Sequence, residues 1–403
     1  MTDVLTKIKK AAAGCDERVL QAIDLDLIKI DTGAILEVAP YLQSKGYWKI
    51  SIAADATTYE VAGNKLVEVI ENTAISVHRT IIKPDPQGDV IADEASLLQL
   101  IADIKQNEAE AVIAVGGGTL HDIVRYSAYL LGIPFISVPT APSVDGFNSK
   151  GAPILIRGEK ITIPAIGPDA IFADLDVLVK APKALVAAGF GDMLGKYTSL
   201  FDWKFGSLVA GEPYLQAAAD ITRSALQQCV KHVDLIADRR EEGIRTLISA
   251  LIESGLAMLL LGQSHPASGA EHHLSHYWEM EYIKLERRQL LHGAKVGVAC
   301  IEISKLYHRI AHEGWKNQSW TSEAEKPDPI TVNWEEISKE IRDIPTGETL
   351  GKLLRKVGGP ISVEELPVSK ELLERSLREA HQVRPNRFTL LRAYNEQLNL
   401  QIN

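Results

Sequence analysis

Short runs rich in β-branched residues alternate with helix-like runs over the first ~175 residues, and this alternation constrains the fold more than any other feature. Strand-like runs cover residues 47–55, 75–83, 111–118 and 134–141. Between them, residues 60–72, 94–106 and 119–132 carry apolar side chains at helical spacing. Strands that are separated by helices indicate a parallel sheet with crossover helices.

The sequence changes character near Pro182, beyond which the convincing patterns are helical, in residues 183–206, 213–236, 243–262 and 293–313. A polar, Pro-containing stretch over residues 314–334 predicts an exposed loop. We therefore expect an α/β, Rossmann-like parallel-sheet domain over residues 1–178, followed by an all-α domain over residues 179–403. Ligands commonly bind between such domains, near the carboxyl ends of the strands.

Composition excludes several classes of protein. The formal net charge is −10 and the basic runs are short, so nucleic acid is not an expected partner, because phosphate binding requires clustered Lys and Arg. Three widely spaced cysteines without a CxxC motif favour free thiols in a reducing compartment. The first residues lack an apolar core of signal-peptide length, and the most apolar stretch, residues 247–261, is interrupted by polar residues and predicts a buried helix. We expect a cytoplasmic protein without a membrane partner.

A run of three glycines, Gly116, Gly117 and Gly118, separates a strand-like run from a helix-like run. Glycines there allow a pyrophosphate to approach the helix N-terminus, but the GxGxxG fingerprint is missing and a plain tight turn explains the run equally well. The next strand-like run also ends in a polar loop, PTAPSVDGFNSKGAP, which contains Asp145. Asp55 follows an earlier strand-like run. Such loops converge at one edge of a parallel sheet, which favours a ligand site.

The helical half contains three pieces with side chains that bind borderline divalent metals: Asp192 in GFGDMLGK, near the expected start of a helix; a histidine cluster in GAEHHLSH; and His292 before Gly293. In the cluster, His272 and His276 share a helix face, and so do His273 and His276, whereas adjacent His272 and His273 diverge. Helix geometry therefore leaves open which two histidines face one site. Ordinary surface or capping histidines are the alternative.

Taken in order, these motifs resemble the superfamily of metal-dependent polyol dehydrogenases and dehydroquinate synthases. Within it, PTAPSVDGFNSKGAPI, GFGDMLGK and HPASGAEHHLSH are similar to the sn-glycerol-1-phosphate dehydrogenase family in its bacterial form. The resemblance covers essentially the whole chain and implies a dehydroquinate synthase-like fold. It implies metal ligation by Asp192, His272 and His292, and it leaves His273 off the site and dispensable.

The resemblance also implies the ligand contacts. His276 and Asp145 match catalytic positions that contact the substrate, as does Asp192. We add Lys150 as a candidate for the substrate phosphate, because a cation is needed and it lies in the same loop; simple solvent exposure is the alternative. The positions that match the cofactor cradle are Asp55, Gly116, Gly117, Gly118, Thr119, Leu120, His121, Asp122, Thr140, Ala141, Pro142, Ser143 and Ser149.

The implied activity is the reversible reduction of dihydroxyacetone phosphate to glycerol 1-phosphate, a precursor of glycerophospholipids and ether lipids. The expected cofactors are NAD or NADP and one divalent metal that acts as a Lewis acid, with nickel or zinc favoured and iron also suited to the ligands. The implied partners are a phosphorylated triose or glycerol and a second copy of the chain in a homodimer. A glycerol dehydrogenase acting on unphosphorylated substrates, a dehydroquinate synthase-type lyase and a non-catalytic binding protein are the alternatives.

Overall fold

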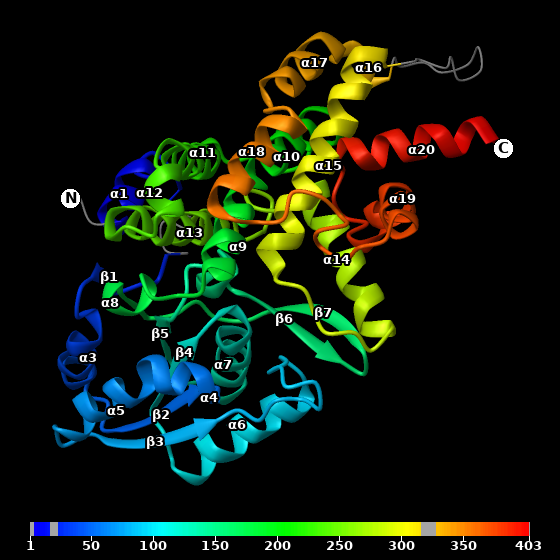
Figure 1. Cartoon of the computed structure of the whole chain (residues 1–403). Helices are drawn as coiled ribbons and strands as arrows, with labels where there is room; N and C mark the ends of the chain where they lie inside the picture. Colours follow the sequence, from blue (N-terminus) through cyan, green and yellow to red (C-terminus); the bar gives the residue numbers. More distant parts are fainter. Residues whose placement is uncertain (1–3, 17–22, 316–327, 403) are drawn as a thin grey trace.

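The computed structural model describes residues 4–16, 23–315 and 328–402. Within them, a six-stranded sheet and the helices around it lie at one end of the molecule, and a larger helical region lies at the other (Figure 1). The predicted combination of a parallel-sheet domain with a helical region is confirmed.

The sheet has the strand order β1-β8-β5-β4-β2-β3, and its neighbours are parallel. The strands are β1 (Leu27–Asp31), β2 (Lys49–Ala54), β3 (Ser76–Ile81), β4 (Ala111–Gly116), β5 (Phe135–Pro139) and β8 (Ala170–Asp174). The chain runs outward from β2 to β3 and then returns to β4 on the other side of β2. The carboxyl ends of β2 and β4 therefore flank the point where the strand order reverses, which is where open α/β sheets bind ligands.

Helices cover both faces of the sheet because its strands are apolar on both sides. On one face, α3 (Val38–Lys45) and α5 (Asn64–Glu71) pack against side chains such as Ile113. On the other, α6 (Glu94–Gln106) and α7 (Gly118–Leu131) pack against its neighbours Val112 and Ala114. This doubly covered arrangement is typical of parallel sheets.

An antiparallel hairpin, which the strand pattern did not reveal, projects from the sheet domain. It consists of β6 (Gly151–Ile156) and β7 (Glu159–Pro164). Arg157 and Gly158 both have positive φ angles, 51° and 80°, as a two-residue turn of this twist requires. Figure 1 shows the hairpin reaching toward α14 (Ala270–Lys284) of the helical region. The hairpin therefore brings a piece of the sheet domain to the helical half.

The helical region is built on α9 (Lys183–Leu194), α10 (Lys196–Ala210), α11 (Gln216–Lys231), α13 (Glu241–Leu261), α14 and α15 (His292–Glu313). Helix α13 is long and apolar enough to cross a membrane, but 72% of its most apolar window is buried inside the protein. It packs against α9 and α11, so the predicted buried helix is confirmed.

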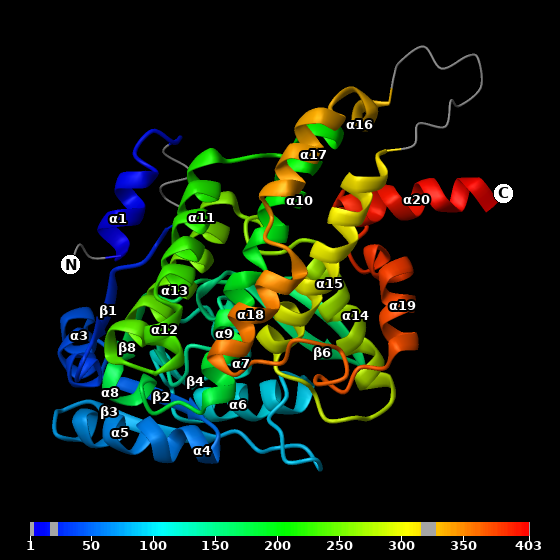
Figure 2. The same cartoon turned by 45° about the horizontal axis from the view of Figure 1, so that its top comes forward.

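Two details differ from the sequence-based expectation. Helix α1 (Val4–Ala11) packs on α11 and α13 of the helical region, although it precedes the sheet in the chain (Figure 2). The expected loop over residues 314–334 lies mostly outside the described residues, and its later part forms α16 (Pro329–Val332) and the start of α17 (Trp334–Asp343).

Helices α9 and α15 approach each other closely, and each carries one of the predicted metal ligands. A Cβ atom on Gly191 would lie 2.4 Å from the carbonyl oxygen of Gly293, and one on Gly293 would lie 1.9 Å from that of Ala188. Because both distances are impossible for real atoms, glycine is required at both positions. The contact sets Asp192 on α9 beside His292 on α15.

Candidate metal and substrate site

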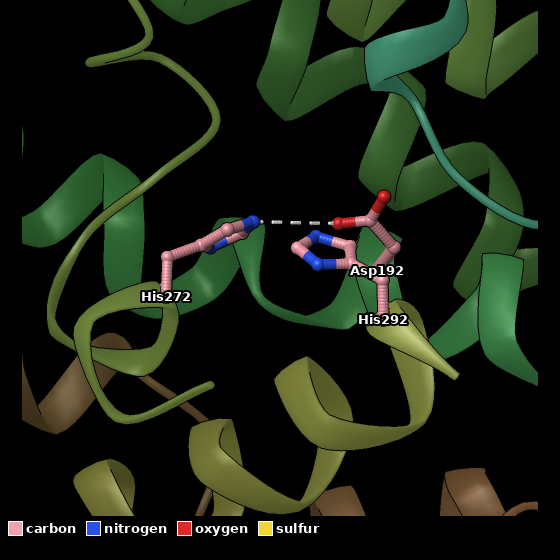
Figure 3. A group of neighbouring side chains, drawn as sticks. All are labelled: Asp192, His272 and His292. Carbon is pink, nitrogen blue, oxygen red and sulfur yellow. Dashed lines mark ion pairs between the residues drawn. The ribbon is translucent and has the colours of Figure 1, made fainter. Parts of the chain in front are cut away.

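Asp192, His272 and His292 come together in the helical region. One ligand atom from each lies within 4.8 Å of those of the other two. Figure 3 shows the two imidazole rings and the carboxylate turned toward one another, with His272 Nε2 3.7 Å from Asp192 Oδ1. Asp192 lies near the end of α9 rather than near the start of a helix as expected, while His272 is in the first turn of α14 and His292 begins α15. Two imidazoles and one carboxylate suit a zinc- or nickel-type ion and leave a position open.

Glu271 supports His272, one of the two histidines of this triad. Its buried carboxylate accepts hydrogen bonds at 2.7 Å from His272 Nδ1 and from the Gly269 amide, and at 2.6 Å from the Thr198 hydroxyl. Donation from Nδ1 leaves the Nε2 lone pair of His272 free for a metal. Burial lowers the pKa of His272 well below its usual value, which keeps the ring neutral as a ligand must be.

Lys196 joins the two site aspartates. Its buried ammonium lies 2.7 Å from Asp145 Oδ2 and 3.1 Å from Asp192 Oδ1. Burial opposes its charge, but the two carboxylates outweigh burial and raise the pKa of Lys196. Asp145 also accepts from Ser254 Oγ at 2.7 Å, and its amide donates to Asp192 Oδ2 at 2.9 Å. The predicted catalytic Asp145 is therefore fixed directly against the predicted metal ligand Asp192.

His276 lies on the same face of α14 as His272. The ring centroids of His276 and His292 are 5.9 Å apart, and those of His276 and His272 are 6.2 Å apart. Its Nδ1 lies 3.3 Å from Glu279 Oε2, an oxygen that also lies 2.8 Å from the ammonium of Lys160 on the hairpin. Two elements of the fold thus meet at this histidine.

Among the described residues, His273 belongs neither to the triad nor to the ring contacts around it. The side chain is fully buried, and neither ring nitrogen has a hydrogen-bond partner among the described residues. The rings of His272 and His276 thus lie near that of His292, and the dispensability of His273 stays a prediction.

The predicted cofactor positions gather at the carboxyl edge of the sheet. Asp55 follows β2, the glycine run begins at the last residue of β4, and residues 140–143 follow β5, and these strands are neighbours. Gly117 precedes the N-terminus of α7, and no protein atom lies within 4 Å of where its Cβ would be. This open space at a helix N-terminus, next to the reversal of strand order, fits a cofactor pyrophosphate.

Several of these side chains have local partners. Asp55 caps α4 (Ala56–Thr58), with its carboxylate 2.7 Å from the Thr58 amide. His121 is turned into the domain, with Nδ1 2.8 Å from the Gly117 carbonyl and Nε2 2.7 Å from Ser137 Oγ. Thr119 is exposed, whereas Leu120, Thr140, Ala141, Pro142, Ser143 and Ser149 are buried.

Asp122 is part of a clamp that the sequence did not reveal. Its carboxylate accepts from buried Arg125 at 2.6 Å, and Arg125 also donates to the backbone carbonyls of Gly146, Phe147 and Gly151. Burial raises the pKa of Asp122 to about 7, against the opposing charge of Arg125. Helix α7, which starts at the glycine run, therefore holds the loop that carries Asp145.

Comparison with known proteins identifies the family. A family model described as iron-containing alcohol dehydrogenase matches residues 29–182. A glycerol-1-phosphate dehydrogenase (NAD(P)+) from Geobacillus stearothermophilus is 46% identical over 387 residues, which are 95% of each chain. The chain belongs to the glycerol-1-phosphate dehydrogenase family.

The bacterial form of glycerol-1-phosphate dehydrogenase is the more similar one, as predicted. The enzyme of that name from Pyrococcus furiosus is 33% identical over 334 residues, or 83% of each chain. A crystal structure of glycerol dehydrogenase from Schizosaccharomyces pombe shares the fold, with a TM-score of 0.65 and 21% identity over 88% of this chain and 82% of that one. The protein is thus an oxidoreductase of the class that acts on CH–OH groups.

Sequence reasoning missed several polar residues of this glycerol-1-phosphate dehydrogenase site. Glu271 and Lys196 stand inside the quoted motifs, and their proximity to ligand positions was the available signal. Arg384 lies 108 residues beyond His276, and its Nη2 is 3.3 Å from His276 Nε2. Lys150, the candidate for the substrate phosphate, has an exposed side chain and no ion pair among the described residues.

Proposed function

We propose that this protein is an NAD(P)-dependent sn-glycerol-1-phosphate dehydrogenase that reversibly reduces dihydroxyacetone phosphate to glycerol 1-phosphate. The observation that carries the proposal is the convergence of Asp192, His272 and His292, backed by Glu271, near the buried cations Lys196 and Lys295. Full-length relatives with that name support the substrate.

The proposed metal ligands are Asp192, His272 and His292, and the proposed ion is nickel or zinc. When bound, a divalent ion would supply a Lewis acid for the C2 oxygen, and NAD or NADP would supply or accept the hydride. The cofactor is proposed to bind along Asp55, the glycine run and residues 140–143.

The chain's own groups orient and shield the substrate. Asp145, fixed by Lys196 and Ser254, presents a carboxylate to the substrate hydroxyls. His276 orients the substrate from the other side and is the proposed relay for its proton. Complete burial of Asp192, Lys196 and Glu271 keeps water away from the charged groups that hold the site together.

The biological setting extends the proposal. We place the enzyme in the cytoplasm as a homodimer that supplies glycerol 1-phosphate for ether lipids and other glycerophospholipids. The division into a cofactor domain over residues 1–178 and a metal domain over residues 179–403 stays part of the proposal, with α1 packed on the second.

The test is a substrate panel on purified protein with measured metal content. We expect NADH or NADPH oxidation with dihydroxyacetone phosphate, loss of activity with a chelator, and recovery with Ni²⁺ or Zn²⁺. Equal turnover of unphosphorylated dihydroxyacetone would identify a glycerol dehydrogenase instead. Metal binding without turnover of any member of the panel would reject the enzymatic proposal.

A further inference from the structure

Arg384 differs from the other cations around the site because its partners are all neutral. Its Nη1 donates to Ser264 Oγ at 2.9 Å and to Ser268 Oγ at 3.1 Å, and its Nη2 donates to His276 Nε2 at 3.3 Å. By contrast, Lys160, Lys196 and Lys295 each have a carboxylate oxygen within 3.4 Å. Among the described residues, no carboxylate forms an ion pair with Arg384.

Two buried residues near Arg384 also have polar atoms without hydrogen-bond partners. Arg387 is only 4% exposed, and none of its three guanidinium nitrogens has a hydrogen-bond partner in the described part of the chain. Its nearest carboxylate, that of Glu212, is 3.7 Å away. Both ring nitrogens of buried His273 are also unpaired. Buried donors without hydrogen-bond partners are costly, and Arg387 has only a long ion pair with Glu212, so the surroundings of Arg384 are complementary to an anion.

Arg384 and its neighbours are next to the proposed reacting centre. His276 connects Arg384 to the metal triad. It accepts a hydrogen bond from Arg384, and its ring centroid lies 6.2 Å from that of His272 and 5.9 Å from that of His292. In dihydroxyacetone phosphate, one methylene group and one ester oxygen separate C2 from the phosphorus. If the C2 oxygen of the substrate lies at the metal triad, its phosphate is therefore close enough to reach Arg384.

We propose that Arg384, held by Ser264 and Ser268, binds the substrate phosphate and makes the site select phosphorylated over unphosphorylated trioses. The inference rests on the proposed function and names the group that gives it specificity. A planar guanidinium offers a fork of N–H donors that matches phosphate oxygens. An unphosphorylated triose would leave the guanidinium without an anion, and sites built for a polar group reject analogues that lack it.

The first test compares Arg384→Gln, Arg384→Lys and a control, Arg378→Gln, which removes an exposed cation from α19 (Lys370–Glu379). For Arg384→Gln we expect KM for dihydroxyacetone phosphate to rise roughly 10- to 100-fold, because hydrogen bonds to charged groups have that strength. Residual turnover of dihydroxyacetone should fall much less than that of dihydroxyacetone phosphate, since only the phosphorylated triose presents an anion to Arg384. Arg384→Lys should recover part of the loss, and the control should match wild type.

The second test measures binding without turnover, with inorganic phosphate as the probe. Phosphate should raise the melting temperature of the wild type and of Arg378→Gln, but not that of Arg384→Gln. An unchanged KM in Arg384→Gln, or equal losses on both trioses, overturns the inference while the proposed function stands. If the wild type binds phosphate through Arg384 but does not reduce dihydroxyacetone phosphate, the proposed function fails and the phosphate site stands.

Discussion

Glu271 is predicted to control metal affinity without touching the metal. In Glu271→Gln the amide keeps the shape of the side chain but removes the charge that His272 Nδ1–H faces at 2.7 Å. A hydrogen bond to a charged group contributes about 1.5–3 kcal/mol and a neutral one about 0.5–1.5 kcal/mol. The difference of about 1–1.5 kcal/mol corresponds to roughly tenfold weaker metal binding, and loss of ligand basicity extends the range toward 100-fold.

The assay is competition for Zn²⁺ or Ni²⁺ with a chromogenic chelator. Glu253→Gln is the matched control, because Glu253 is another buried glutamate, paired with Lys7 at 2.7 Å on a different helix. It should lower stability and leave metal affinity unchanged. If Glu271→Gln binds metal as tightly as wild type, or if both variants weaken binding equally, the assignment of Glu271 to the support of His272 is refuted.

Three further predictions concern the glycine run and the histidines. Gly117→Ala should fold like wild type, since the new methyl meets open space, but should raise KM for NADH or NADPH by about tenfold or more. Burial lowers the pKa of His121 to about 3, so the unfolded chain, in which histidine titrates near ~6.5, binds an extra proton in between. His121 alone should therefore lower the stability by up to ~1.4 kcal/mol per pH unit below about pH 6.5, so that stability falls more steeply in wild type and in the exposed control His312→Gln than in His121→Gln. His272→Ala should lose metal and activity, whereas His273→Ala should keep its metal but lose at least ~1 kcal/mol of stability because the side chain is buried.

Each of these has a clear opposing result. A Gly117→Ala protein with wild-type KM would remove the glycine run from the cofactor site. Parallel stability curves for wild type and His121→Gln in urea titrations from pH 7 to pH 4 would contradict a neutral buried ring. Metal analysis that finds an empty His273→Ala protein and a loaded His272→Ala protein would reverse their roles.

The strand–helix alternation was readable from the sequence because each crossover unit is local. Residues 94–106 were predicted as a helix and form α6 with those bounds. The hairpin was missed because its alternation is weak and its turn depends on the backbone angles of Arg157 and Gly158. Local sequence patterns predict helices and strands, but they carry little information about a hairpin that projects from the sheet.

The predicted site was incomplete for a different reason. The motif residues Asp192, His272 and His292 stand beside recognisable glycines and in a histidine cluster. Arg384 and Arg125 carry no such marker, since a single arginine is ordinarily solvent-exposed. Their roles follow from contacts across many residues, Arg384 with Ser264 and His276, and Arg125 with the carbonyls of residues 146–151. Tertiary packing decides such contacts.

The glycine contact between α9 and α15 has a consequence for engineering. Gly191 precedes Asp192 and Gly293 follows His292, so the spacing of two helix backbones determines how far apart these two donors stand. These two glycines therefore set the separation of two of the three proposed metal ligands. Libraries that aim to exchange the metal should therefore keep both glycines and the donor residues, and should vary other side chains that pack between α9 and α15.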